Sequence, residues 1–145
     1  MDSKYYTPKH FSIKEWVPPD LYTEMGDSAI VLLDDRILRT ADAVRDHFGV
    51  PVTINDWMRG GSFKQRGLRT EMVPGGAKHG PHFYGRAFDC DVQGLTADQV
   101  RKEILANANA DVFGLVTGME IGITWVHLDC ANRYSANGEI VLFSA

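Results

Sequence analysis

The stretch Gly80-Pro-His-Phe-Tyr-Gly-Arg-Ala-Phe-Asp89 restricts the fold more than any other part of the sequence. It places His82 in a glycine-bearing loop and Asp89 seven residues later, in a segment typical of a strand. Gly85 permits a tight turn between them, and Ala87 is small enough for close packing behind the pair. Imidazole nitrogen and carboxylate oxygen are both zinc ligands in proteins. Such a spacing is common by chance, so on this stretch alone we would expect the two side chains to lie apart rather than to form a metal site.

A second stretch, Trp125-Val-His-Leu-Asp129, changes that interpretation. Side chains alternate between the two faces of a strand, so Trp125, His127 and Asp129 share one face while the two apolar residues between them face the core. His127 would add a third ligand to the histidine and aspartate of the first stretch. Two imidazoles and one carboxylate leave the fourth coordination position of zinc to water, as in catalytic zinc sites. The sequence therefore predicts a metal site built from a loop and two strands.

The periodicity of the remaining sequence predicts an α+β fold, in which N-terminal helices pack on a mostly antiparallel sheet. One apolar stripe at steps of three and four predicts a helix over 29–48, capped by Asp27 or Ser28. Two further helices are expected, a short one from the capping box Ser12–Glu15 to the Pro18-Pro19 pair and one from the capping box Thr96–Gln99 to about Asn109. Strands are expected over 50–54, 87–92, 121–128 and 139–143. The connecting segments are a loop over 20–27, an irregular loop over 60–80 and a turn at Asn137-Gly138.

Composition restricts the class of protein. The chain has 145 residues and a net charge of −4, with 44% hydrophobic and 23% charged residues, which predicts one globular domain over residues 1–145, expected to be a monomer. No basic cluster is present, which argues against a nucleic-acid partner. No apolar run reaches the ~18 residues of a membrane span, and the N-terminus lacks the apolar core of a secretory signal. Cys90 and Cys130 are expected to be buried free thiols rather than a disulfide.

The two stretches resemble the zinc D-alanyl-D-alanine carboxypeptidases and their phage endolysin relatives. The first is similar to the signature Ser-x-His-x-x-Gly-x-Ala-x-Asp of that family, and the second to its Phe-Val-His-x-Asp strand. Three further segments are similar to family motifs and occur in the same order, namely Lys9–Glu15 to "HFSxxE", Val52–Arg59 to "ITINSGYR" and Gly75–Lys78 to "GGAKNSxH". The resemblance implies a Hedgehog/DD-peptidase-like fold, zinc as the cofactor, and His82, Asp89 and His127 as its ligands.

The sequence departs from the family pattern at three places. Gly80 stands where the signature has serine. Asp56-Trp-Met58 precedes the arginine of "SGYR", so only that arginine is retained. Some family members carry an acidic residue three positions before the last histidine, where this chain has Thr124. The general base therefore has to be found elsewhere.

Two acidic residues are candidates for that base. Asp129 is the first, because it shares a strand face with His127 and a base must lie within hydrogen-bond reach of the proton that it accepts. Glu120 is the second, because Gly122 could bend the chain and bring it to the site. Asp129 could instead be a ligand, or could orient a histidine from behind.

Four residues are candidates for substrate binding, each with a plainer alternative. By resemblance, Arg59 corresponds to the family arginine that grips a substrate carboxylate, which a guanidinium binds through two hydrogen bonds. The alternative is a surface arginine that follows a strand. His79 could donate a hydrogen bond to the substrate, or be a solvated loop residue. Tyr84 and Trp125 could wall the cleft, or pack in the core.

The resemblance implies zinc-dependent hydrolysis of peptide bonds in bacterial peptidoglycan stem peptides, by a carboxypeptidase or by an endopeptidase of the endolysin kind. Because the serine and the acid of the family pattern are missing, an alternative stays open, in which the protein binds a metal but is inactive and serves in wall recognition or as a structural part of a phage. A hydrolase of another amide is a third possibility. A chain made in the cytoplasm without a signal peptide would act at the wall after release, or as a phage component, and a role in cytoplasmic recycling fits equally well.

Overall fold

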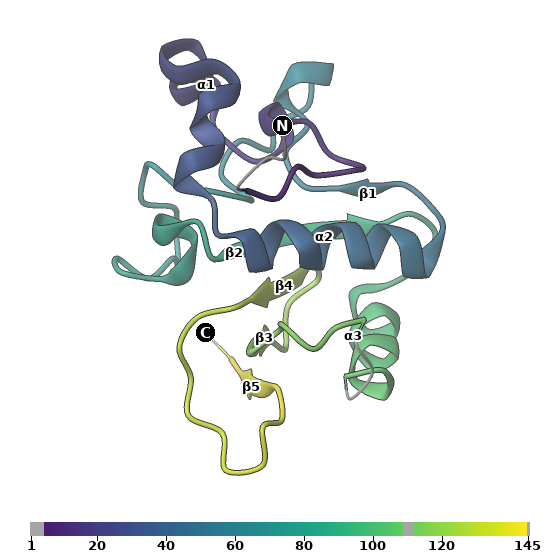
Figure 1. Ribbon diagram of the computed structural model, residues 1–145. Coiled ribbons are helices and arrows are strands. Elements are labelled where there is room, and N and C mark those ends of the chain that lie inside the picture. Colours follow the sequence, from purple (N-terminus) through teal and green to yellow (C-terminus); the bar gives the residue numbers. More distant parts are fainter. Residues whose placement is uncertain (1–4, 109–111, 145) are drawn as a thin grey trace.

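The computed structural model describes residues 5–108 and 112–144. No helix among these residues is both long enough and apolar enough to cross a bilayer. The elements, in chain order, are η1 (Ile13–Glu15), α1 (Pro19–Met25), η2 (Gly26–Leu32), α2 (Asp35–Phe48), β1 (Val52–Thr53), η3 (Trp57–Arg59), η4 (Pro81–Tyr84), β2 (Ala87–Val92), α3 (Ala97–Ala106), β3 (Gly118–Glu120), β4 (Val126–Asp129) and β5 (Val141–Phe143), where η denotes a 3-10 helix. In this part of the chain, α2 runs across a sheet, α1 stands apart from the sheet with the N-terminal segment, and α3 lies at one end (Figure 1).

The sheet has the strand order β1-β2-β4-β3-β5. Three of its four pairings are antiparallel, and only β3 and β5 run parallel. The predicted α+β class with a mostly antiparallel sheet is confirmed. β2 and β4 lie at the centre of the sheet, and these are the strands on which the sequence places two of the three metal ligands.

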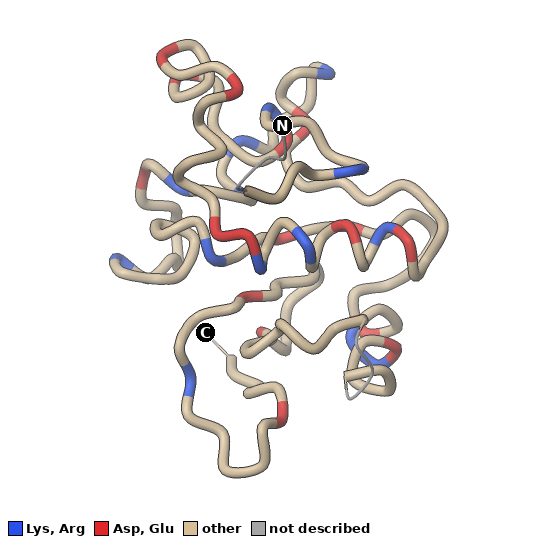
Figure 2. Tube along the Cα trace, viewed as in Figure 1, with Lys and Arg blue, Asp and Glu red and all other residues tan. Residues whose placement is uncertain are grey.

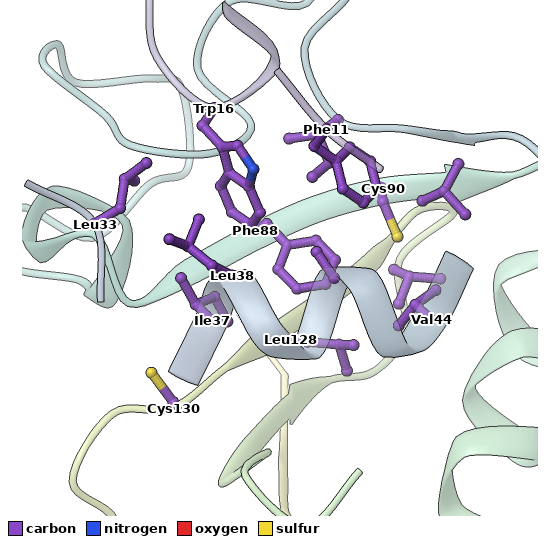
Figure 3. Close-up of a cluster of buried hydrophobic side chains, with 14 of the residues drawn as sticks. Phe11, Trp16, Leu33, Ile37, Leu38, Val44, Phe88, Cys90, Leu128 and Cys130 are labelled. Carbon is purple, nitrogen blue, oxygen red and sulfur yellow. The ribbon is translucent and has the colours of Figure 1, made fainter. Parts of the chain in front are cut away.

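Alternation along the central strands sends apolar side chains to the face that α2 covers. Phe88, Leu128 and Met119 lie on that face and are completely buried. Trp16, from the segment after η1, packs edge-on against Phe88 with ring centroids 5.6 Å apart (Figure 3). Full burial of a side chain of this size stabilises the fold by roughly 1.5–3 kcal/mol. The core therefore lies between the sheet and α2, which leaves the opposite face of β2 and β4 for the polar residues.

The predicted loop over 20–27 is wrong, because α1 occupies most of that range. Pro19 is the first residue of α1, where the missing N–H needs no partner. The Pro18-Pro19 pair therefore begins a helix rather than stopping one, since η1 ends earlier, at Glu15, with Trp16 as its C-cap. The capping box before it is confirmed, since the Glu15 carboxylate accepts a hydrogen bond from the backbone N–H of Ser12 at 2.8 Å.

The predicted helix over 29–48 is correct only in its later part. α2 begins at Asp35, and its N-cap is Asp34, which accepts a hydrogen bond from the N–H of Arg36 at 2.9 Å. The residues before it form η2 and an extended residue, Leu33. The apolar stripe continues through this break, so periodicity alone does not reveal it. The predicted caps Asp27 and Ser28 lie within η2 instead.

The predicted strand over 121–128 is also wrong in its first half. β4 begins only at Val126, and the residues before β4 form a loop that joins it to β3. Gly122 lies in this loop with a φ of 77°, a value that favours glycine and interrupts an extended chain. The strands predicted over 50–54 and 139–143 are shorter in the structure, where they are β1 and β5.

The remaining expected elements agree with the structure. The second capping box is formed, with hydrogen bonds of 2.9 and 3.1 Å between Thr96 and Gln99. The predicted end of that helix, Asn109, lies outside the described residues. A turn occurs at Asn137-Gly138, as expected. Figure 3 shows Cys90 and Cys130 at opposite ends of the core cluster, and both are buried free thiols as predicted.

Charged residues of both signs are interspersed along the chain. Figure 2 shows Lys and Arg alternating with Asp and Glu along α2, with further charges of each sign on the surrounding loops. The net charge of −4 is thus spread rather than gathered in one stripe.

Candidate metal centre

Three polar residues form one row across the sheet. Asp89 on β2 lies opposite His127 on β4, and His127 lies opposite Glu120 on β3. Side chains directly opposite each other on antiparallel strands project from the same face, with Cβ atoms about 4.5–5.5 Å apart. The pairing register therefore places one carboxylate on each side of the His127 imidazole, on the face of the sheet away from the core.

His82 reaches this row from η4, the 3-10 turn that leads into β2. The turn ends at Gly85, which has a φ of 68°. A side chain at that position would also collide with the chain before α2, since a Cβ would lie 2.0 Å from the carbonyl oxygen of Leu32. Only glycine fits both requirements. The tight turn that the sequence predicts at this residue is thus present, and it returns the chain from His82 into β2.

The three predicted ligands meet at one point. His82 Nε2 lies 3.2 Å from His127 Nδ1 and 3.2 Å from Asp89 Oδ1, and His127 Nδ1 lies 3.0 Å from Asp89 Oδ1. Zinc bonds of 2.0–2.1 Å in a tetrahedron require ligand atoms about 3.3 Å apart. The triangle is therefore close to the size that a tetrahedral zinc ion needs, and the three residues could hold a metal ion.

The other nitrogen of each imidazole is held by an acceptor. His82 Nδ1 lies 2.8 Å from the carbonyl oxygen of Gly67, and a carbonyl can only accept, so this nitrogen carries the proton. His127 Nε2 lies 2.9 Å from Asp129 Oδ2, which fixes its proton in the same way. In the neutral form of each imidazole, the lone pair therefore lies on the nitrogen that faces the triangle. This is the arrangement that orients histidine ligands in metal sites.

The electrostatics of the group favour a cation at its centre. Burial raises the pKa of Asp89, but hydrogen bonds and charge from His127 and His82 outweigh burial and hold this pKa well below its usual range. Burial lowers the pKa of His127, but the carboxylates of Asp129 and Asp89 outweigh burial and raise it. The carboxylates thus stay ionised and attract positive charge. A divalent ion satisfies this field with all three ligands deprotonated.

Asp129 lies behind His127, away from the triangle. Its side chain is fully buried, and Arg133 donates to both of its oxygens, at 2.9 and 2.7 Å. The room for this pair comes from Gly118 on β3, where a Cβ would lie 2.3 Å from Arg133 Nε. The Arg133 guanidinium also lies over the ring of Phe143 on β5, 4.5 Å from its centroid. Asp129 is therefore occupied on both oxygens and does not face the cleft, which is the geometry of an orienting residue.

A cleft of about 470 Å³ opens over the triangle. Glu120 and Trp125 line it, as do two arginines, Arg69 and Arg133, and the loop residues 73–77. Of the two candidates for the base, Glu120 is the one that lines this cleft. Trp125 forms part of the wall, with 38% of its surface exposed.

Three of the predicted substrate residues lie elsewhere. Arg59 is more than half exposed and pairs with Glu15 at 3.3 Å, and the cleft lining does not include it. His79 and Tyr84 are exposed and are not among the lining residues. Thr124, at the position where some family members have an acid, lines a different cavity. The structure thus brings together the three ligand residues, Glu120 and Trp125.

Sequence reasoning misses two residues of the site, Arg69 and Arg133. Arg69 lies in the loop over 60–80, and its Nη2 donates to Asp89 Oδ2 at 3.2 Å. The loop passes the site because Leu68 donates to the carbonyl of Trp16 at 2.8 Å, a contact that no local pattern predicts. Arg133 follows Asp129 by four residues, and its proximity in sequence to an acid already singled out is the signal that could have identified it.

The comparisons with known proteins agree with this geometry. A family model described as Peptidase M15 matches residues 23–129, which include all three ligand residues and Glu120. The comparison with curated proteins and the comparison with solved structures gave no match. M15 metallopeptidases depend on zinc, in agreement with the buried His-Asp-His group. The chain therefore belongs to the M15 peptidase family, that of the zinc D-alanyl-D-alanine carboxypeptidases and their endolysin-type relatives.

Proposed function

We propose that this protein hydrolyses peptide bonds in the stem peptides of bacterial peptidoglycan, as a zinc-dependent carboxypeptidase or endolysin-type endopeptidase. The observation that carries the proposal is the row Asp89–His127–Glu120, completed by His82. It combines three residues that could hold a metal ion with a further carboxylate, that of Glu120, which lines the same cleft. An inactive metal-binding module has no need of that carboxylate.

His82 Nε2, Asp89 Oδ1 and His127 Nδ1 would hold the zinc ion. When bound there, zinc polarises the scissile carbonyl and makes water a nucleophile near neutral pH. The protein fixes its ligands through the Gly67 carbonyl and the Asp129 carboxylate. Their directions are thus set before any metal arrives, which reduces the reorganisation that binding requires.

Glu120 would act as the general base and then as the general acid. It would take a proton from the attacking water and give it to the amine that leaves when the C–N bond breaks. Its place opposite His127 puts its carboxylate on the metal-binding face. This assignment also explains how the chain can lack an acid at Thr124, since that residue faces another cavity. Asp129 would orient His127 rather than accept a proton.

Arg69 would bind a carboxylate of the substrate. Its side chain is mostly buried and lines the cleft, while its Nε and one Nη are held by the Gln65 carbonyl and by Asp89. Burial lowers the pKa of Arg69, and the charges of Asp89 and Glu120 oppose this. A guanidinium fixed in this way can offer its remaining N–H groups to an anionic peptide terminus or side chain. We propose Arg69 for the role that the resemblance gives to Arg59.

The site of action follows from the substrate. Stem peptides lie in the cell wall, so we propose that the protein acts there as a monomer, after release from the cytoplasm or as part of a phage particle. Trp125 would provide an apolar wall for the peptide, together with Val73, Pro74 and Phe143, which line the same cleft.

Digestion of purified peptidoglycan tests this proposal. Wild-type protein loaded with zinc is incubated with muropeptides, and the products are separated and weighed by mass spectrometry. We expect loss of a terminal D-alanine or cleavage within the stem or cross-bridge, and no cleavage by His82→Ala. Stoichiometric zinc without any turnover would contradict the proposal and would support the inactive module. Cleavage of unrelated amides with intact muropeptides would support the third possibility.

A further inference from the structure

The loop 121–125 separates two cavities. Trp125 lines the metal cleft, whereas Ile123 and Thr124 line a second cavity of about 320 Å³, which also borders β2 and the start of α3. Most of the loop residues are exposed to solvent. A segment with cavities on both sides has little packing to hold it, so its position depends on its hydrogen bonds.

Those hydrogen bonds come from two places. At the start of the loop, the N–H of Ile121 donates to the carbonyl of Phe143 on β5 at 2.8 Å. At the end of the loop, Arg101 reaches out from α3. Its Nη1 donates to the carbonyl of Trp125 and its Nη2 to that of Ile123, both at 2.9 Å. One guanidinium therefore holds the two backbone carbonyls that flank Thr124.

Arg101 is unusual for a helical arginine because its side chain is only 6% exposed. Within residues 5–108 and 112–144, the carboxylate that it pairs with is Asp98, which is 90% exposed and lies one turn earlier on α3, at 2.6 Å. A buried arginine usually needs a buried partner, since desolvation of its charge is costly. Here the carbonyls of the loop supply that partner. The orientation of the Arg101 side chain is thus explained by its hydrogen bonds to the loop carbonyls rather than by its ion pair with Asp98 on α3.

We propose that Arg101 is a positioning residue for the cleft, which sets where Trp125 stands in the wall and so how well a substrate fits. It touches neither the metal ligands nor Glu120, which come from η4, β2, β4 and β3. Loss of Arg101 should therefore alter the wall while the metal centre stays as it is. The part of this proposal that concerns substrate rests on the proposed function, and the part that concerns Trp125 does not.

The first test observes Trp125 directly. The chain has three tryptophans, so protein labelled with 5-fluorotryptophan should give three ¹⁹F resonances, and Trp125→Phe identifies one of them. In Arg101→Met we expect that resonance to shift or broaden, while those of the buried Trp16 and of Trp57 stay in place. Arg101→Lys keeps the charge but cannot span two carbonyls as a fork, so we expect a smaller change in the same resonance. An unmoved Trp125 resonance in both variants would overturn the proposal.

A matched control comes from a second buried arginine. Arg66 is 10% exposed and pairs with Asp91 at 3.0 Å, on the side of β2 that faces β1. Arg66→Met removes a buried guanidinium of the same kind without touching the loop 121–125. We expect it to leave the Trp125 resonance unchanged. An equal shift in Arg66→Met would show that loss of any buried arginine disturbs the wall, and the proposal would fail.

Kinetics on a muropeptide then test the link to substrate. We expect Arg101→Met to raise KM about fivefold or more with kcat within about twofold, because the wall changes and the reacting groups do not. Bound zinc should match wild type. A fall in kcat with no change in KM would contradict the role in substrate fit. If wild type cleaves no muropeptide, the proposed function fails, and the ¹⁹F result still decides whether Arg101 positions Trp125.

Discussion

Glu120 and Asp129 are both acids beside His127, and their different surroundings are the basis on which we propose different chemical roles for them. Glu120 lies opposite His127 in the sheet and lines the cleft, where a substrate or water can reach it. Asp129 lies behind the same imidazole with both oxygens bound by Arg133. A general base needs access to the reacting proton. An orienting carboxylate needs only its histidine.

Substitution of Glu120 tests the first role. Glu120→Gln keeps the shape of the side chain and removes its ability to accept a proton. We expect kcat on a muropeptide to fall by about 10²–10⁴, the usual contribution of general acid–base catalysis, with bound zinc at the wild-type level. Steady-state kinetics and metal analysis measure both quantities. Retention of more than a tenth of wild-type kcat would exclude Glu120 as the base.

Substitution of Asp129 tests the second role. In Asp129→Asn, a neutral amide with one acceptor oxygen replaces the carboxylate that His127 and Arg133 share, so the tautomer of His127 is held less firmly and we expect zinc affinity to fall by about 10–100-fold. Competition with a chromogenic chelator measures the affinity. Activity should return when zinc is raised to saturation, because Glu120 is intact. Unchanged zinc affinity together with lost activity would instead restore Asp129 as the base.

A pair of arginine variants separates the two candidates for carboxylate binding. Arg69→Ala should raise KM for a substrate with a free carboxylate by about tenfold or more, since one charge-assisted pair is worth a factor of that size. Arg59→Ala should change KM by less than about twofold, because Arg59 pairs with Glu15 outside the cleft lining. Kinetics of both variants on one muropeptide make the comparison. The opposite ranking would return the role to Arg59.

At the scale of elements, β4 organises the site because it pairs with both neighbours that carry acids. Its register with β2 and β3 forms the row of polar residues, and its other face contributes Leu128 to the core. A shift of one residue in either pairing would turn His127 into the core. The same strand pairing that buries the apolar residues therefore also assembles the ligands.

Asp42, a buried acid on α2, binds the N-terminal segment through three hydrogen bonds, beside the contacts that the exposed Asp35 and Asp46 make with the same segment. Asp42 accepts hydrogen bonds from the backbone N–H groups of Lys9 and His10, at 2.8 and 3.0 Å, and from the hydroxyl of Tyr6. Burial raises the pKa of Tyr6 to about 12, and the hydrogen bond to Asp42 and its charge act in the same direction. The interaction thus requires a neutral tyrosine.

Substitution of Tyr6 should reveal this as a pH-dependent stability. We expect Tyr6→Phe to lower the free energy of unfolding by about 1 kcal/mol at neutral pH, the net value of one hydrogen bond. The folded-state pKa of about 12 exceeds the ordinary tyrosine pKa of 10.0, so the stabilisation is complete below pH 10 and is lost as pH rises toward 12. Urea unfolding of both proteins at neutral and alkaline pH measures the difference. A difference that stays constant or grows at alkaline pH would contradict this account.

At the scale of the whole molecule, the sequence predicts those features that depend on local patterns. His82, Asp89 and His127 stand in motifs with characteristic spacing, and the structure brings them together. The capping boxes and the stripe of α2 depend on neighbours three and four residues apart, and they are also present. Alternation along β4 correctly sends Leu128 to the core.

The features that the sequence misses depend on contacts that its local periodicity does not encode. The path of Arg69 is set by the backbone of Trp16, which lies against Gly67, where a Cβ would lie 2.4 Å from the Trp16 carbonyl oxygen. Alternation predicts the face on which Asp129 lies, but not that Arg133 closes over it. Periodicity does not predict the break before α2, because the apolar stripe continues through it. Of these contacts, only the one between the loop and Trp16 joins distant segments. Arg133 lies four residues from Asp129 and the cap of α2 is local, and these two are missed because neither follows from periodicity.

The central claim is that one zinc ion binds between His82, Asp89 and His127. Anomalous diffraction at the zinc edge, from crystals grown with zinc, tests it most directly. We expect one strong peak bonded to His82 Nε2, Asp89 Oδ1 and His127 Nδ1 at about 2.0–2.2 Å, with its fourth position open to the cleft. Crystals with ample zinc and no peak between these three atoms, or with these side chains turned apart, would contradict the account.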